Sequence, residues 1–246
     1  MEYTITATTD IAEGVVLSID KPYGWTSADV VRKLKFLLTK ISGIRKLKVG
    51  HAGTLDPLAT GVLLVCVGKA TKIAESLQAE RKEYLAEVML GATTPSYDLE
   101  HPIDKTYPTD HITPELVTKA LQELTGERLQ TPPIYSAKKI EGRRAYDFAR
   151  EGEELAMECR STLINIYNIE VVEMELPRLV IRVECSKGTY IRSLAHEIGQ
   201  KLDSGAHLTM LRRTKSGTHS VEEAHNLDEL LKNLQELKQN LKDNVI

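Results

Sequence analysis

The sequence predicts an α+β fold arranged as one continuous domain. Two hydrophobic periods occur along the chain, one typical of strands and the other typical of helices. Residues 82–90 and 179–185 alternate between the two faces of a strand, whereas residues 30–38 carry apolar side chains at spacings of three and four. No internal repeat and no flexible linker interrupts the 246 residues, which are enough to bury a substantial core.

The composition is that of a soluble globular protein, with 41% apolar and 27% charged residues. No apolar run reaches the roughly 20 residues that cross a bilayer, and the N-terminus lacks the pattern of a secretory signal. The three cysteines show no CxxC spacing and the seven histidines show no HxH or HExxH spacing. We therefore expect a cytoplasmic protein with no membrane contact and no metal site.

The net charge of −3 argues weakly against a nucleic-acid partner, but the basic residues are unevenly distributed. They gather in three clusters: Lys33, Lys35, Lys40, Arg45, Lys46 and Lys48; then Lys138, Lys139, Arg143 and Arg144; then Arg212, Arg213 and Lys215. Such clusters are consistent with solvated surface or with a track that binds phosphates. Composition alone leaves both interpretations open.

The chain begins with a strand expected over residues 14–20, which stops in a turn at Lys21-Pro22. Thr26 or Ser27 then caps an amphipathic helix. The single tryptophan, Trp25, lies in the connection between the two, and we expect it to anchor the core.

Residues 48–72 organise the rest of the chain. Glycines and a proline are predicted to break any helix or strand from Gly50 to Gly61. The apolar run from Val62 to Val67 then suits a strand that is buried on both faces. Asp56 thus lies on a tight loop that leads into a core strand, where catalytic groups are common. Because Asp-Pro is also ordinary turn chemistry, a purely structural role for Asp56 remains open.

The following elements are expected from the same patterns. Helices are predicted over residues 70–77, from Thr113-Pro114 to Gly126, after a cap at Thr189, and over residues 227–241. Strands are predicted over residues 82–90, 163–173, 179–185 and 206–220. The segment Gln130–Gly152 mixes prolines, tyrosines and basic residues, a composition that favours RNA contact over an ordinary basic loop.

Several blocks of the chain resemble one family. HAGTLDPLATG, residues 51–61, is similar to the signature loop of the TruB family, the bacterial tRNA pseudouridine-55 synthases. The other similar blocks are DKPYGWTS at residues 20–27, KEY at 82–84, CSKGTYIRSLAHEIGQKL at 185–202 and the LxRxxxG block that begins at Leu211. Together they place residues 14–220 within the resemblance.

The resemblance implies a pseudouridine synthase fold: a mixed, largely antiparallel sheet flanked by helices, with an RNA-binding thumb insertion at about residues 130–152. It implies a catalytic domain over residues 1–220 and a short helical tail over residues 221–246. The tail is too short for the PUA-type domain that longer family members carry, so we expect that domain to be absent.

The resemblance also implies roles for individual residues. Asp56 takes the place of the catalytic nucleophile, Arg192 pairs with it, and Tyr84 stacks on the flipped uracil. The implied substrate-binding residues are Tyr190, Leu211, His51 and Lys21. The implied RNA-binding residues are Lys138, Lys139, Arg143, Arg144 and Arg212.

The expected activity is the isomerisation of uridine to pseudouridine at position 55 in the T-loop of tRNA. This reaction is redox-neutral, so no cofactor is expected, and the expected partner is the T-arm of tRNA, bound by a monomer without a protein partner. One alternative is a tRNA-binding folding chaperone without catalysis, which has no use for an ionised Asp56. Another is a glycosyl hydrolase or transferase, which lacks a second suitably placed carboxylate.

Overall fold

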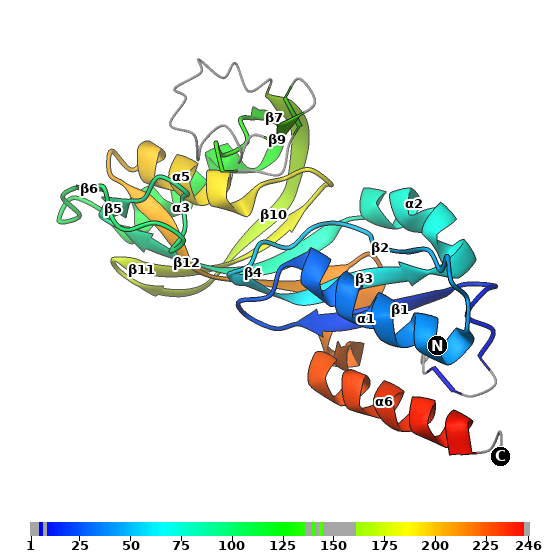
Figure 1. Ribbon diagram of the computed structural model, residues 1–246. Helices are drawn as coiled ribbons and strands as arrows, with labels where there is room; N and C mark the ends of the chain where they lie inside the picture. Colours follow the sequence, from blue (N-terminus) through cyan, green and yellow to red (C-terminus); the bar gives the residue numbers. More distant parts are fainter. Residues whose placement is uncertain (1–4, 7–8, 136–138, 141–142, 145–160, 244–246) are drawn as a thin grey trace. The chain divides into compact units, whose positions relative to one another are not determined.

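The computed structural model describes residues 5–6, 9–135, 139–140, 143–144 and 161–243. The chain forms two compact units (Figure 1). The first unit consists of residues 1–83 and 212–246, and the second consists of residues 84–211. Two strands pass from one unit into the other: β4 (Lys82–Leu90) and β12 (Ala206–Ser216).

The sheet of the first unit is centred on β3 (Ala59–Val67), which pairs antiparallel with β1 (Val15–Lys21) and β2 (Val49–His51). β14 (His225–Asn226) pairs parallel with β1, and β13 (His219–Ser220) pairs antiparallel with β12. Every residue from Val62 to Val67 has an exposed fraction of 0%. The predicted strand with two buried faces is therefore confirmed.

The helices of the first unit are α1 (Ser27–Ser42), the 3₁₀-helix η1 (Gly68–Ile73), α2 (Ala74–Ala79), the 3₁₀-helix η2 (Val221–Glu223) and α6 (Leu227–Asp243). A capping box between Thr26 and Asp29 begins α1, and a left-handed Gly43 (φ 70°) ends it. α6 packs against α1 and buries Leu230, Leu231 and Leu234. The predicted C-terminal helix thus belongs to the core of the first unit.

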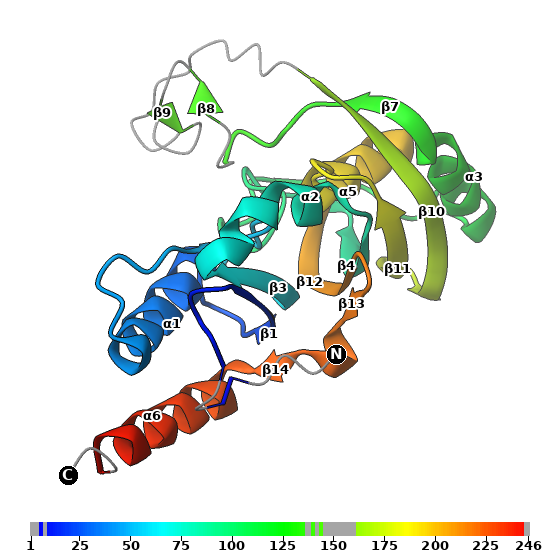
Figure 2. The ribbon, with the colours of Figure 1, turned by 90° about the vertical axis from the view of Figure 1, so that its right-hand side faces the viewer.

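The second unit contains the strand order β12-β4-β11-β10-β7. The long strand β10 (Thr162–Glu175) curves between β11 (Arg178–Cys185) and β7 (Gly126–Gln130), and it pairs antiparallel with both (Figure 2). α3 (Pro114–Leu124) packs against β10 and α5 (Ile191–Lys201). Two short hairpins complete the unit: β5 (Ala92–Thr93) with β6 (Lys105–Thr106), and β8 (Lys139–Ile140) with β9 (Arg143–Arg144).

The predicted α+β class with a mixed, largely antiparallel sheet is confirmed. The expectation of an uninterrupted loop from Gly50 to Gly61 is wrong at both ends, because β2 ends at His51 and β3 begins at Ala59. Pairing with β3 supplies ladder hydrogen bonds to β2, which outweigh the weak strand preference of Gly50.

The predicted cap at Thr189 is also wrong. Helix α5 begins at Ile191, and the Thr189 hydroxyl instead donates to the carbonyl of Ser186. In the part of the chain that the structure describes, no helix has the length and apolar character needed to cross a membrane.

Candidate active site

Residues 52–58 of the signature loop join β2 to β3 in the first unit and carry Asp56. Its ends are fixed by the pairing of these strands and by a hydrogen bond from the Ala52 amide to the Leu64 carbonyl at 2.9 Å. The Leu55 side chain is buried in the core, while Asp56 is half-buried. Three buried polar side chains, those of Lys21, Ser27 and Arg213, hold the backbone of the loop.

Lys21 is the first of these side chains. It lies at the end of β1 with an exposed fraction of 0%. Its Nζ donates to the carbonyls of Pro22 (2.9 Å), Trp25 (2.6 Å) and Pro57 (3.3 Å). The Pro57 carbonyl belongs to the signature loop and also accepts from the Gly24 amide at 2.9 Å. Lys21 therefore ties the turn after β1 to the residue next to Asp56.

Burial lowers the pKa of Lys21 from 10.5 to about 8. The Asp56 carboxylate opposes this effect by stabilising the ammonium, whereas the Arg213 guanidinium adds to it. A group that remains mostly protonated at neutral pH thus provides positive charge to the signature loop.

Ser27, the first residue of α1, is the second buried group. Its Oγ donates to the Leu55 carbonyl at 2.9 Å and accepts from the Leu55 amide at 2.9 Å. One hydroxyl therefore satisfies both backbone groups of the residue that precedes Asp56.

Arg213 on β12 is the third buried group, with an exposed fraction of 1%. Its Nε donates to the Val62 carbonyl at 2.7 Å, and its two terminal nitrogens donate to the carbonyls of Thr54 (3.4 Å) and Gly53 (3.2 Å). The backbone of Arg213 also lies close to the backbone of Gly61. Only glycine fits there, since a Cβ atom on residue 61 would lie 2.1 Å from the Arg213 carbonyl oxygen.

His51 ends β2 next to the signature loop and is half-buried. Burial, followed by the charge of Arg213, lowers its pKa below 6.5. The Nδ1 atom is buried and has no hydrogen-bond partner among the described residues. The lowered pKa favours the neutral imidazole.

The other predicted catalytic and substrate-binding residues lie in the second unit. Tyr84 on β4 is 8% exposed, and Leu211 is half-buried on β12. Tyr190 precedes α5, and its amide and carbonyl are held by the side chain of Gln130 at 2.8 and 3.1 Å. This bidentate contact fixes the start of the helix that carries Arg192.

Arg192 is 4% exposed and lies opposite Asp98. Its Nε is 3.8 Å from an Asp98 carboxylate oxygen, and its Nη1 donates to the Ser96 carbonyl at 3.2 Å. The loop that carries these partners includes Tyr97 at a left-handed φ of 62°, which is rare for a residue with a Cβ. The predicted ion pair between Arg192 and Asp56 stays a prediction.

All three residues of the third basic cluster contact partners within the protein. Arg213 is buried, and Arg212 makes two contacts with the Asp20 carboxylate at 2.7 and 3.1 Å. Lys215 pairs with Glu83 at 3.2 Å. Of the second cluster, Lys138 and the side chains of Lys139, Arg143 and Arg144 lie outside the described residues.

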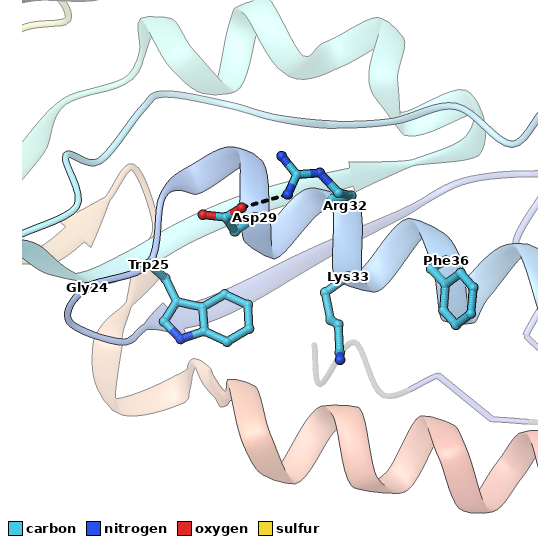
Figure 3. Close-up of a pocket in the computed structure, with 6 residues that line it drawn as sticks. All are labelled: Gly24, Trp25, Asp29, Arg32, Lys33 and Phe36. Atoms are coloured by element: carbon cyan, nitrogen blue, oxygen red, sulfur yellow. Dashed lines mark hydrogen bonds and ion pairs between the residues drawn. The ribbon is translucent and has the colours of Figure 1, made fainter.

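The expected role of Trp25 as a core anchor is wrong. Its side chain is only half-buried and lines an open pocket of about 500 Å³ beside α1 (Figure 3). Arg32, Lys33 and Phe36 of α1 line the same pocket, and Phe36 is 55% exposed. The turn after β1 is instead anchored by Lys21, whose side chain is buried and bonded to the carbonyls of the turn.

Sequence reasoning missed Ser27, Arg213 and Asp98 as groups that hold the site. Ser27 is the last residue of the DKPYGWTS block, but its contact with Leu55 spans 28 positions. The sequence gives no sign that Arg213 is buried, because residues in a basic cluster are usually exposed. Asp98 lies between short elements without a periodic pattern, so no signal indicates that it faces Arg192.

Two family models match the chain. The family model described as TruB family pseudouridylate synthase (N terminal domain) matches residues 39–191. The model described as tRNA pseudouridylate synthase B C-terminal domain matches residues 192–246.

Similar curated proteins are each called tRNA pseudouridine synthase B. The protein from Phocaeicola vulgatus is 55% identical over 86% of this chain and 89% of its own length. The protein from Bacteroides fragilis is 57% identical over 86% of this chain and 90% of its own length. A more distant relative from Clostridium tetani is 48% identical over 87% of this chain and 72% of its own length.

Two solved structures have the same fold over nearly the whole chain. A Cbf5-Nop10-Gar1 complex contains a chain with a TM-score of 0.71 and 32% identity, covering 96% of this chain and 59% of that one. An H/ACA RNP bound to a substrate RNA containing 2'-deoxyuridine gives a TM-score of 0.67 and 29% identity, covering 97% and 60%. This chain thus spans about three fifths of the length of those two. With a family match over more than half of its residues and relatives above 50% identity, the chain belongs to the TruB family of pseudouridylate synthases.

Proposed function

We propose that this protein converts uridine to pseudouridine in tRNA, at position 55 of the T-loop, with Asp56 as the nucleophile. The proposal rests first on family membership and on relatives called tRNA pseudouridine synthase B. The observation that carries it is the signature loop, where Lys21, Ser27 and Arg213 fix the backbone on both sides of Asp56.

The reaction breaks the bond between N1 of uracil and C1′ of ribose and forms a bond between C5 and C1′. The proton on C5 is lost and N1 gains one, so no electrons are exchanged and no external reactant is consumed. Asp56 must act as an anion to hold the detached fragment covalently. The buried ammonium of Lys21 favours that anion electrostatically.

The residues of the second unit have proposed roles in the same reaction. A base in a loop is extruded at lower cost than a base in a duplex, and an aromatic side chain replaces its lost stacking. We assign the stacking to Tyr84 and the lining of the uracil pocket to Tyr190 and Leu211. Arg192 is assigned to orient charge at the reacting centre, with Asp98 and the Ser96 carbonyl fixing its guanidinium.

The direct test is conversion of a T-arm hairpin and of full-length tRNA, with chemical labelling to detect pseudouridine. We expect pseudouridine at position 55 in both, with kcat/KM values within about tenfold of each other, or roughly 1.4 kcal/mol of transition-state binding. Replacement of uridine 55 by cytidine is the matched RNA control. Pseudouridine at another position, or none, would disprove the assigned target.

Asp56→Asn separates catalysis from RNA binding. The amide keeps the shape of the side chain but removes the anion, so single-turnover conversion should vanish while hairpin affinity stays within about threefold. Asp228→Asn is a suitable control, since Asp228 lies in the same unit and is exposed on α6. A variant with full affinity and no turnover excludes the chaperone alternative, because a chaperone has no turnover to lose; measurable conversion by Asp56→Asn would exclude the nucleophile.

A further inference from the structure

A second pocket of the first unit is lined largely by cations. It has a volume of about 600 Å³ and lies among α1, the connection from α1 to β2, and η1. Its lining residues are Lys35, Arg45, Lys46, Leu47, Lys48, Val49, Gly50 and Thr71. Four of these eight residues are basic and none is acidic. We call this site the basic pocket.

The four cations of the basic pocket are available to a ligand. Lys35, Arg45, Lys46 and Lys48 are exposed, and none of their side chains makes a hydrogen bond or ion pair with another described residue. Basic residues elsewhere contrast with them: Arg212 pairs with Asp20, Arg178 with Glu87, Lys201 with Glu123 and Lys215 with Glu83. In a chain with a net charge of −3, these cations concentrate positive potential at one place.

The backbone that carries the cations is fixed. The Leu47 side chain is buried with an exposed fraction of 3%, and its amide donates to the Ile44 carbonyl at 3.3 Å. The Lys48 carbonyl accepts from the Gly68 amide at 2.8 Å, and Val49 pairs with Val67 of β3. The lysine and arginine side chains therefore extend from a structured base, which lowers the entropic cost of binding.

The chemistry of the site suits a phosphodiester. Three basic residues within four positions neutralise more than one negative charge, and the arginine provides a planar pair of donors that matches phosphate oxygens. A Cβ atom placed on Gly50 meets no heavy atom within 4 Å, so the backbone there is open to a ligand. β2 continues from this pocket into His51 and the signature loop. A phosphate bound in this pocket would therefore hold the RNA at a fixed position relative to Asp56, which lies in the same unit.

We propose that the basic pocket binds the phosphate backbone of the RNA substrate. The proposal rests on the proposed function for the identity of the RNA, but the role that it assigns is separate from catalysis. The pocket positions the RNA and takes no part in the chemistry.

The test is a comparison of two double variants of the full chain with equal charge. Lys46→Gln/Lys48→Gln removes two lysines from the basic pocket, and Lys232→Gln/Lys238→Gln removes two from α6 in the same unit. Affinity for a fluorescent T-arm hairpin is measured by anisotropy from about 50 to 200 mM salt. Melting temperatures of both variants verify that they fold.

We expect the pocket variant to lower the slope of log Kd against log salt by about one phosphate contact, or roughly 0.7 to 0.9. Its Kd at physiological salt should rise about tenfold, with KM rising in parallel and kcat unchanged. The α6 variant should bind as the unmodified protein does. If both variants weaken binding equally, or neither does, the pocket is not a specific phosphate site.

The same data separate the two proposals. If the two variants differ in the slope of log Kd against log salt but the protein forms no pseudouridine, the basic pocket is supported and the proposed function is overturned. Pseudouridine formation with identical behaviour of the two variants would overturn the basic pocket and leave the proposed function standing.

Discussion

Lys21 is an ammonium group enclosed by the backbone that it supports. A buried lysine is unfavourable unless its donors are used, and here three carbonyls accept from one Nζ. Its charge still carries a cost, because burial lowers its pKa to about 8. The residue therefore combines a structural role, holding Pro57, with an electrostatic effect on Asp56.

The altered pKa of Lys21 predicts a pH dependence of stability. Between pH 8 and 10.5 the unfolded chain keeps the Lys21 proton while the folded chain releases it, so the free energy of unfolding rises with pH. The contribution is at most about 3 kcal/mol. Lys21→Met should lose this rise, although it is less stable overall because three carbonyls lose their donor. Urea unfolding of both proteins across this range measures the difference, and parallel curves would contradict the assignment.

Arg192 predicts a loss of turnover that exceeds any loss of binding. Arg192→Lys keeps the charge but cannot contact Asp98 and the Ser96 carbonyl with a planar guanidinium. We expect kcat to fall about a hundredfold while the Kd for the hairpin changes less than about threefold. Arg182→Lys on β11, where the ion pair with Glu170 is exposed, is the matched control. A parallel fall of affinity and turnover would make Arg192 an RNA contact.

At the scale of elements, hydrogen bonds join the start of α1 to the signature loop. Ser27 joins them through the two hydrogen bonds to Leu55. Ser27→Ala leaves the buried amide and carbonyl of Leu55 without this partner, so we expect the free energy of unfolding to fall by about 1–3 kcal/mol. We also expect kcat to fall, because the backbone next to Asp56 is no longer held. Ser76→Ala on α2 of the same unit removes an exposed hydroxyl bond to the Ile73 carbonyl and should change stability by less than about 0.5 kcal/mol. Thermal unfolding and single-turnover rates measure both variants.

The elements with a clear hydrophobic period were predictable. β3, β4 and α3 occur where the pattern placed them, because burial of one or both faces requires that pattern. β7 was not predicted, since GERLQ has little strand character and owes its form to pairing with β10. The signature loop itself was found through its similarity to a family. The side chains that hold it, Lys21 and Arg213, were not predictable as buried, because charged residues are rarely found inside unless local carbonyls receive their donors.

At the scale of the whole molecule, the proposed catalytic groups are divided between the units. Asp56 belongs to the first, and Tyr84, Tyr190 and Arg192 belong to the second. The ion pair between Asp56 and Arg192, which the resemblance to the family implies, stays a prediction.

A double-mutant cycle tests this predicted ion pair. Asp56→Asn, Arg192→Gln and the combined variant are unfolded in urea, with fluorescence of the single Trp25 reporting on the first unit. The contact of Arg192 with Asp98 is lost in both backgrounds and cancels. We expect an interaction free energy of about 1 kcal/mol or more, whereas additive effects within about 0.3–0.5 kcal/mol would show that the two charges do not interact.

The path of the chain has a consequence for how the protein is made. The second unit is a single continuous segment, whereas the first combines residues 1–83 with residues 212–246. On the ribosome, β1 and β3 are made before the second unit, whereas β14, the buried face of α6 and the Arg213 that binds the signature loop are made after it. The second unit can therefore fold during synthesis, while the loop that carries Asp56 reaches its final form only after residues 212–246 have been made. A chain that stops before residue 212 would lack the groups that hold the loop of the proposed nucleophile, so we expect it to show no activity.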